Sequence, residues 1–282
     1  MRAPDREAAW VTQPLRRALD RAITELRRTI MRGGAARYPA ERVLLLQQEL
    51  TRQGVRLDTA TQATIRRYTQ VAARYADAGA GTILGQLQDA TGTPTPYGAL
   101  PTTVASASVR ATHSRIQAAI GTVRTHLGQA ATQALADATA AAGAGAITWR
   151  QAAREAMAGL TRSGVTALVD SAGRRWALDT WSQMAVRTGL LEAQRDAQLA
   201  QMRALGLDLV TVPHHGHPCP LCSPWEGTIL RMDDSADGPQ TVTRTTPAGD
   251  TVQVRTAGTI AEARRAGLMH PNCAHTWSAW TG

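Results

Sequence analysis

The chain of 282 residues contains no phenylalanine and only three cysteines. It also contains no lysine, so every basic side chain other than histidine is an arginine. Cysteines this few fit a reducing compartment rather than a disulfide-dense secreted scaffold. At this length the sequence accommodates one large domain or two smaller ones.

Long apolar runs are absent as well. A membrane-spanning helix needs about 18–20 apolar residues, and the most apolar stretch, residues 138–147, is short and consists mainly of Ala and Gly. The first residues are polar and charged, without the apolar segment of a secretory signal. We therefore expect no membrane partner and no secretion.

The net charge is +9 and is carried by arginine. Arginine suits phosphate recognition, so a basic chain can meet polyanions such as DNA. The arginines are spread along helical segments, which predicts at most non-specific contact with nucleic acid. Solvated helix faces and the coding bias of a GC-rich genome explain the same composition.

Apolar residues recur at helical spacing through the first half of the chain. The pattern predicts a helix over residues 5–31, ended by Gly33-Gly34, and a second over residues 39–53, ended by Gly54. A third begins near residue 58, with an expected break at residues 79–81, and ends at Gly92. A Pro/Gly linker follows, then an Ala-rich helix over residues 102–142 and a shorter helix over residues 149–160.

The character changes after residue 164, where short β-branched runs alternate with turns. We expect strands at residues 165–169, 175–178, 208–212 and 227–232, a hairpin across residues 241–254, and helices over residues 179–205 and 259–266. The predicted class is α+β, with a mostly helical N-terminal part and a small α+β C-terminal domain. The predicted regions are 1–92 (helical), 93–101 (linker), 102–163 (Ala-rich helical) and 164–282 (α+β).

All three cysteines lie in this last region, beside histidines. Cys219 and Cys222 form a C-x-x-C pair, and Cys273 lies between His270 and His275. Two such turns supply the thiolate and imidazole ligands that a tetrahedral zinc takes from paired knuckles. One disulfide with a free thiol, three buried thiols, or a redox-active pair are the alternatives.

The predicted zinc ligands are Cys219, Cys222 and Cys273, with His275 or His270 as the fourth. His214 and His217 are alternative fourth ligands, since they precede the first cysteine turn. A closed four-ligand site would be structural and would stabilise a domain with little core of its own. A site with an open position could support catalysis.

Three classes of enzyme are alternatives to a structural zinc site. Zinc deaminases need an H-x-E ligand and acid/base motif, and none occurs in the chain. Maturation proteases need a nucleophile and a base, and no such arrangement is visible. A metal-dependent nuclease or a prophage-borne toxin-like enzyme remains open, with His214 or His215 as base and Asp208 or Glu226 as metal ligand.

A set of spaced motifs in the C-terminal region resembles the tailed-phage family called phage minor capsid protein 2. The motifs are Gly164-Val165, Asp170-Ser171-Ala172-Gly173-Arg174-Arg175-Trp176, Met184-Ala185-Val186-Arg187-Thr188, Gly206-Leu207-Asp208-Leu209-Val210 and Trp225-Glu226-Gly227. The Cys/His motifs are similar to those of Mu-type minor head proteins, in which the last element is usually H-P-N-C-R-C. Here His275 stands in place of the last cysteine, which favours it as a ligand.

This resemblance implies a structural minor head protein of a tailed bacteriophage or prophage, associated with the portal and procapsid assembly. It implies the portal protein and the major capsid or scaffold protein as partners, with packaged DNA as a non-specific contact. The implied location is the virion head, assembled in the cytoplasm of the bacterial host.

Overall fold

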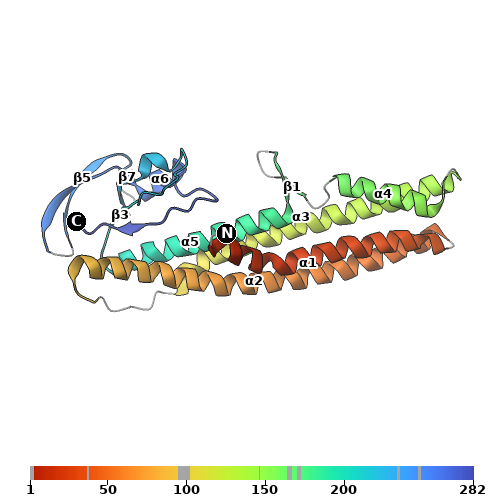
Figure 1. Ribbon diagram of the computed structural model, residues 1–282, viewed down its shortest axis with the longest axis horizontal. Helices are drawn as coiled ribbons and strands as arrows, with labels where there is room; N and C mark the ends of the chain where they lie inside the picture. The colour runs from red at the N-terminus through yellow and green to blue at the C-terminus, as the bar shows by residue number, and fades with distance from the viewer. Residues whose placement is uncertain are drawn as a thin grey trace. The chain divides into compact units, whose positions relative to one another are not determined.

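The computed structural model describes residues 3–36, 38–94, 102–145, 147–163, 167–169, 173–233, 236–246 and 249–282. Its helices are α1 (Ala3–Arg32), α2 (Pro39–Thr91), α3 (Thr102–Gly143), α4 (Trp149–Ser163), α5 (Leu178–Ala204) and α6 (Ile260–Arg265), with 3-10 turns η1 (Gly33–Ala35) and η2 (Ser223–Trp225). Its strands are β1 (Ala167–Val169), β2 (Arg175–Ala177), β3 (Leu209–Thr211), β4 (Ile229–Arg231), β5 (Gln240–Thr245), β6 (Thr251–Thr256), β7 (Gly258–Thr259) and β8 (Ser278–Ala279). The predicted class, helical first and α+β afterwards, is confirmed (Figure 1).

Helix α2 is longer than the sequence predicted. The expected ends at Gly54 and at residues 79–81 are wrong, because one helix runs from Pro39 to Thr91 (Figure 1). Gly79 serves close packing instead: a Cβ added there would lie 2.5 Å from the carbonyl oxygen of Gln194 in α5. A glycine inside a helix costs about 0.5–1 kcal/mol, a penalty that tertiary packing can exceed.

The chain divides into two compact units that are discontinuous in sequence. Unit 1 comprises Met1–Arg67 and His113–Val186, and unit 2 comprises Tyr68–Thr112 and Arg187–Gly282. Helices α2, α3 and α5 each contribute one segment to each unit.

Unit 1 has a helical core that combines alanines with larger apolar side chains. Four helices, α1 to α4, contribute to it, and its buried members include Leu26, Ile30, Leu46, Leu127, Ala131, Leu135, Ala138, Ala153 and Met157. The alanines allow close helix packing but bury little apolar area each. β1 and β2 form a short antiparallel pair in the same unit.

Trp149, the first residue of α4, closes the end of α1. Its indole Nε1–H donates to the carbonyl oxygens of Ile30 and Met31 at 3.1 and 3.2 Å. These are among the last carbonyls of α1, which have no partner within that helix. Gly34 contacts the indole so closely that any side chain there would collide with it.

Unit 2 contains a four-stranded sheet in the order β7-β4-β3-β8. β3 pairs antiparallel with β4 and β8, and β4 pairs parallel with β7. The predicted hairpin is present as β5 and β6, which pair in antiparallel register from Gln240↔Thr256 to Thr245↔Thr251. Its expected turn includes residues 247–248, which lie outside the described part of the chain.

The core of unit 2 joins helices to this sheet. Its buried members include Ile83 of α2, Leu199 and Met202 of α5, and Val210, Leu230, Ile260, Leu268, Cys222, Cys273 and Trp277. Gly189 of α5 lies where a Cβ would collide with Tyr68 and Thr112. The C-terminal sheet therefore packs on helical segments of the same unit instead of forming a separate core.

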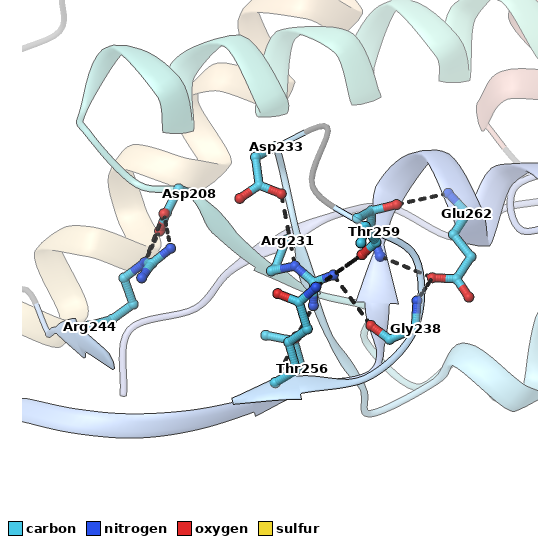
Figure 2. Close-up of polar contacts among 10 residues, drawn as sticks. Asp208, Arg231, Asp233, Gly238, Arg244, Thr256, Thr259 and Glu262 are labelled. Atoms are coloured by element: carbon cyan, nitrogen blue, oxygen red, sulfur yellow. Dashed lines mark hydrogen bonds and ion pairs between the residues drawn. The ribbon is translucent and has the colours of Figure 1, made fainter. Parts of the chain in front are cut away.

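A buried arginine organises the connection after β4. The Arg231 side chain is 1 % exposed and donates to Thr256 and to the carbonyl oxygen of Ala236 at 2.7 Å. Figure 2 shows its guanidinium between Asp233 and Thr256, with Gly238 nearby. Through Arg231, these bonds connect Ala236 and Gly238, which precede β5, with Thr256 of β6.

Several expected features fall on residues that the structure does not describe. They are residues 165–166 of the first expected strand, residues 170–172 of the turn after it, and residues 95–101 of the expected linker. In the remainder of the chain, no helix combines the length and the hydropathy needed to cross a membrane.

Candidate metal centre

The first cysteine turn lies in the loop between β3 and β4. Val212 and Gly227 close this loop, with the N–H of Gly227 donating to the carbonyl oxygen of Val212 at 2.8 Å. Within the loop, the N–H groups of Cys222 and Ser223 donate to the carbonyl oxygen of Cys219 at 3.1 and 2.9 Å. This tight turn brings the two thiols of the C-x-x-C pair to one side.

The second turn follows α6. The N–H of Leu268 ends the helix by donating to the carbonyl oxygen of Ala263. Asn272 then adopts a positive φ of 71°, a conformation that asparagine tolerates better than most residues. The N–H of Cys273 donates to the carbonyl oxygen of His270 at 3.0 Å, which closes the turn.

The two turns bring together five candidate ligands. Their ligand atoms form two triads, each with all atoms within 4.8 Å of one another: Cys219, Cys222 and His270, and Cys222, Cys273 and His275. All five predicted main ligands are therefore neighbours. Cys222 belongs to both triads.

Individual separations are close to those between the ligands of a zinc ion. Cys222 Sγ lies 3.6 Å from Cys273 Sγ, Cys219 Sγ lies 3.0 Å from His270 Nε2, and Cys273 Sγ lies 3.2 Å from His275 Nδ1. Two ligands of a tetrahedral zinc bound at 2.0–2.3 Å would lie about 3.3–3.8 Å apart, so the thiol pair matches this spacing and the two thiol–imidazole pairs are slightly shorter. No disulfide joins the cysteines, since a bonded pair would be about 2.05 Å apart. The cluster can hold a metal ion.

Hydrogen bonds leave each histidine with one nitrogen directed at a thiol. His270 Nδ1 lies 2.6 Å from the carbonyl oxygen of Pro271, and His275 Nε2 lies 2.8 Å from Glu226 Oε1. If these nitrogens carry the protons, Nε2 of His270 and Nδ1 of His275 are free to coordinate. A carboxylate that accepts from the far nitrogen is a usual partner of a metal-bound histidine.

Burial and hydrogen bonds shift the pKa values of ionisable groups in the cluster. Burial opposes ionisation of the Cys219 thiol, but hydrogen bonds from His270 and the Cys222 backbone outweigh it and lower its pKa to about 7. Burial raises the pKa of Cys222 to about 12. The hydrogen bond to His275 lowers the pKa of Glu226. With no cation present, the buried Cys222 is a neutral thiol; a bound metal would supply the charge that a thiolate needs.

The alternative ligands lie at the edge of the cluster. His214 is exposed, and its Nδ1 is 3.4 Å from Glu226 Oε2. His217 is exposed and belongs to neither triad. The His215 ring lies 5.2 Å from that of His275, and its backbone N–H donates to Glu226. Asp208 pairs with Arg244 at 2.7 Å, as Figure 2 shows.

Arg195 of α5 is a residue of this site that the sequence did not identify. Its side chain is buried, and it donates to the carbonyl oxygens of Cys273 and His275 at 2.7 and 2.8 Å. In the sequence it lies four residues from both Leu191 and Leu199, on an apolar helical row, and this position is the signal for its burial.

The structure is that of a helix-rich protein with a small sheet and a Cys/His cluster that can hold a metal ion. Comparison with known families identifies the family. The family model described as Phage minor capsid protein 2 matches residues 36–281. The chain belongs to this family, which supports a structural role in a phage. The match begins three residues before α2 and well before the C-terminal motifs that carry the resemblance. No curated protein and no solved structure matches the chain.

Proposed function

We propose that this chain is a structural minor protein of a tailed-phage or prophage head, associated with the portal and with procapsid assembly. The family match over residues 36–281 is the observation that carries the proposal. A capsid family implies contacts with other head proteins; the portal protein and the major capsid or scaffold protein are the proposed ones. The proposed location is the virion head, reached by assembly in the host cytoplasm.

Within this role, the Cys/His cluster holds a structural zinc ion. Its ligands are Cys219, Cys222 and Cys273, with His275 or His270 as the fourth. The support is the convergence of two distant turns, in which one thiol belongs to both triads. Strands of two or three residues form a weak sheet by themselves, and structural zinc contributes about 10–16 kcal/mol to folding in small peptides.

The net charge of +9 adds non-specific contact with packaged DNA as a further proposal. Binding of this kind depends on counterion release, so it should weaken steeply between low and physiological salt. It would require no sequence preference.

Particles from the phage or prophage that carries the gene test the proposal. Mass spectrometry of purified procapsids and mature heads should detect the chain at low copy relative to the major capsid protein. Chemical cross-linking should join it to the portal protein. A particle population that lacks the chain throughout assembly would refute a role in the head.

One contact favours the enzymatic alternative. The exposed imidazole of His214 beside the Glu226 carboxylate is an acid–base pair at the edge of the cluster. A metal-dependent nuclease using this pair would cleave plasmid DNA with Mg²⁺, Mn²⁺ or Zn²⁺, and His214→Ala would abolish cleavage. Absence of cleavage with all three ions would dismiss this alternative.

A further inference from the structure

The segment that carries the second ligand turn is buried without regular secondary structure. Cys273, His275 and Trp277 are 6, 5 and 1 % exposed, and no strand or helix covers residues 273–277. The backbone groups of such a segment need partners inside the protein, because water cannot reach them.

Helix α5 supplies these partners through a row of polar side chains. The N–H of Asn272 donates to Thr188 Oγ1 at 3.4 Å, and the N–H of Trp277 donates to Gln198 Oε1 at 3.1 Å. Between them, Arg195 donates to the carbonyl oxygens of Cys273 and His275. Residues 188, 195 and 198 are seven and three positions apart, so they fall on one face of the helix. The extended segment therefore follows that face.

Arg195 differs from its neighbours in the row because it brings a charge. Its side chain is 2 % exposed, and a buried guanidinium is costly unless an anion compensates it.

We propose that Arg195 is the positioning residue of the metal centre, and that its charge selects a ligand set with three thiolates. This rests on the proposed zinc site. Three thiolates and one neutral imidazole leave a divalent zinc complex with one net negative charge, and the Glu226 carboxylate bonded to His275 adds a second, so a buried cation beside these ligands is favoured. The two bonds to the carbonyl oxygens of Cys273 and His275 hold both second-turn ligands in place before metal arrives.

Arg195→Met tests the claim by removing the charge and both bonds while keeping an unbranched side chain. Arg195→Lys keeps the charge but not the planar pair of donors. The matched control is Arg231→Met. Arg231 is the same residue type in the same unit, is 1 % exposed, and also donates to backbone carbonyl oxygens. The contacts drawn in Figure 2 join it to Asp233, Gly238 and Thr256 rather than to candidate ligands.

The measurement is a titration of the full-length apoprotein with Co²⁺ and Zn²⁺, in competition with a chromophoric chelator. We expect Arg195→Met to weaken zinc binding by about 10–100-fold, as loss of a residue supporting metal ligands typically does. The thiolate-to-cobalt charge-transfer band should also lose intensity. Arg195→Lys should recover part of the affinity, and Arg231→Met should retain the affinity and the cobalt spectrum of the wild type.

Equal zinc affinity and equal cobalt spectra in Arg195→Met and the wild type would overturn the role of Arg195, but would not contradict the proposed zinc site. A wild-type chain that binds neither ion would overturn both. If both Arg195 variants failed to fold with zinc while Arg231→Met folded, Arg195 would be a determinant of the whole fold and the proposal would be wrong. If Arg195→Lys lost as much zinc affinity as Arg195→Met, the charge of Arg195 would have no role in zinc binding, and that part of the proposal would be wrong.

Discussion

At the scale of single residues, Cys222 is the centre of the Cys/His cluster. It is fully buried in the core of unit 2 and belongs to both ligand triads. It thus connects the first turn, through Cys219, with the second turn, through Cys273. A metal site that uses ligands from both turns depends on it most.

We expect Cys222→Ala to abolish tight zinc binding and to lower Tm by roughly 5 °C or more, because it removes a ligand together with the stability that metal binding contributes. Ser223→Ala is the control, since Ser223 follows in the same turn but is exposed and offers no ligand in either triad. Zinc content by mass spectrometry and Tm by calorimetry check this. Equal Tm for both variants and the wild type would contradict the structural role of the metal.

Glu226 gives a second prediction at this scale. Its carboxylate accepts from His275 Nε2 and from the N–H of His215. Glu226→Gln removes the negative charge that orients His275, so zinc affinity should fall about tenfold or more. His214→Ala is the control, because that ring is exposed although it lies near the same carboxylate. Zinc affinity that is lower in His214→Ala than in Glu226→Gln would contradict the assignment.

At the scale of elements, the glycines of α2 have different roles. Gly79 lies against the backbone of α5 at Gln194, whereas Gly85 has nothing within 4 Å of where its Cβ would be. The sequence predicted a helix break at residues 79–81 and none at Gly85. The packing partner that explains Gly79 lies more than a hundred residues away, so no local pattern could reveal it.

Gly79→Ala should therefore destabilise the protein by about 1–3 kcal/mol, the usual cost of forcing extra volume into a packed contact. Gly85→Ala, in the same helix, should be neutral or stabilise it by up to about 1 kcal/mol, since alanine is the better helix former. Urea unfolding of both variants measures the difference. Two variants of equal stability would argue against the close approach of α2 and α5.

Contacts between elements also explain which features of the fold the sequence could predict. The first long helix, the β5–β6 hairpin and the Cys/His motifs were predicted because each has a local pattern of spacing or turn chemistry. The pairing of β4 with β7, and the row of Thr188, Arg195 and Gln198, depend on contacts between distant segments. The position of Arg195 between Leu191 and Leu199 indicates burial, but only the fold shows that it bonds to the second ligand turn.

At the scale of the whole molecule, all five main ligand candidates belong to unit 2, and none belongs to the core of unit 1. Removal of zinc should therefore raise amide hydrogen exchange across residues 209–279, including β3, β4 and β8. Exchange in α1 should stay unchanged, because local stability follows local contacts. Equal acceleration in both units after chelation would show that the metal stabilises the whole chain rather than the sheet of unit 2.

The most direct test of the central claim is the metal content of the purified, untagged protein. If a zinc ion links the two cysteine turns, the protein should contain about one zinc per chain. A strong chelator should then remove the zinc and disrupt the native structure around both turns. A folded protein that contains no metal, with its three cysteines free or two of them oxidised, would contradict the account.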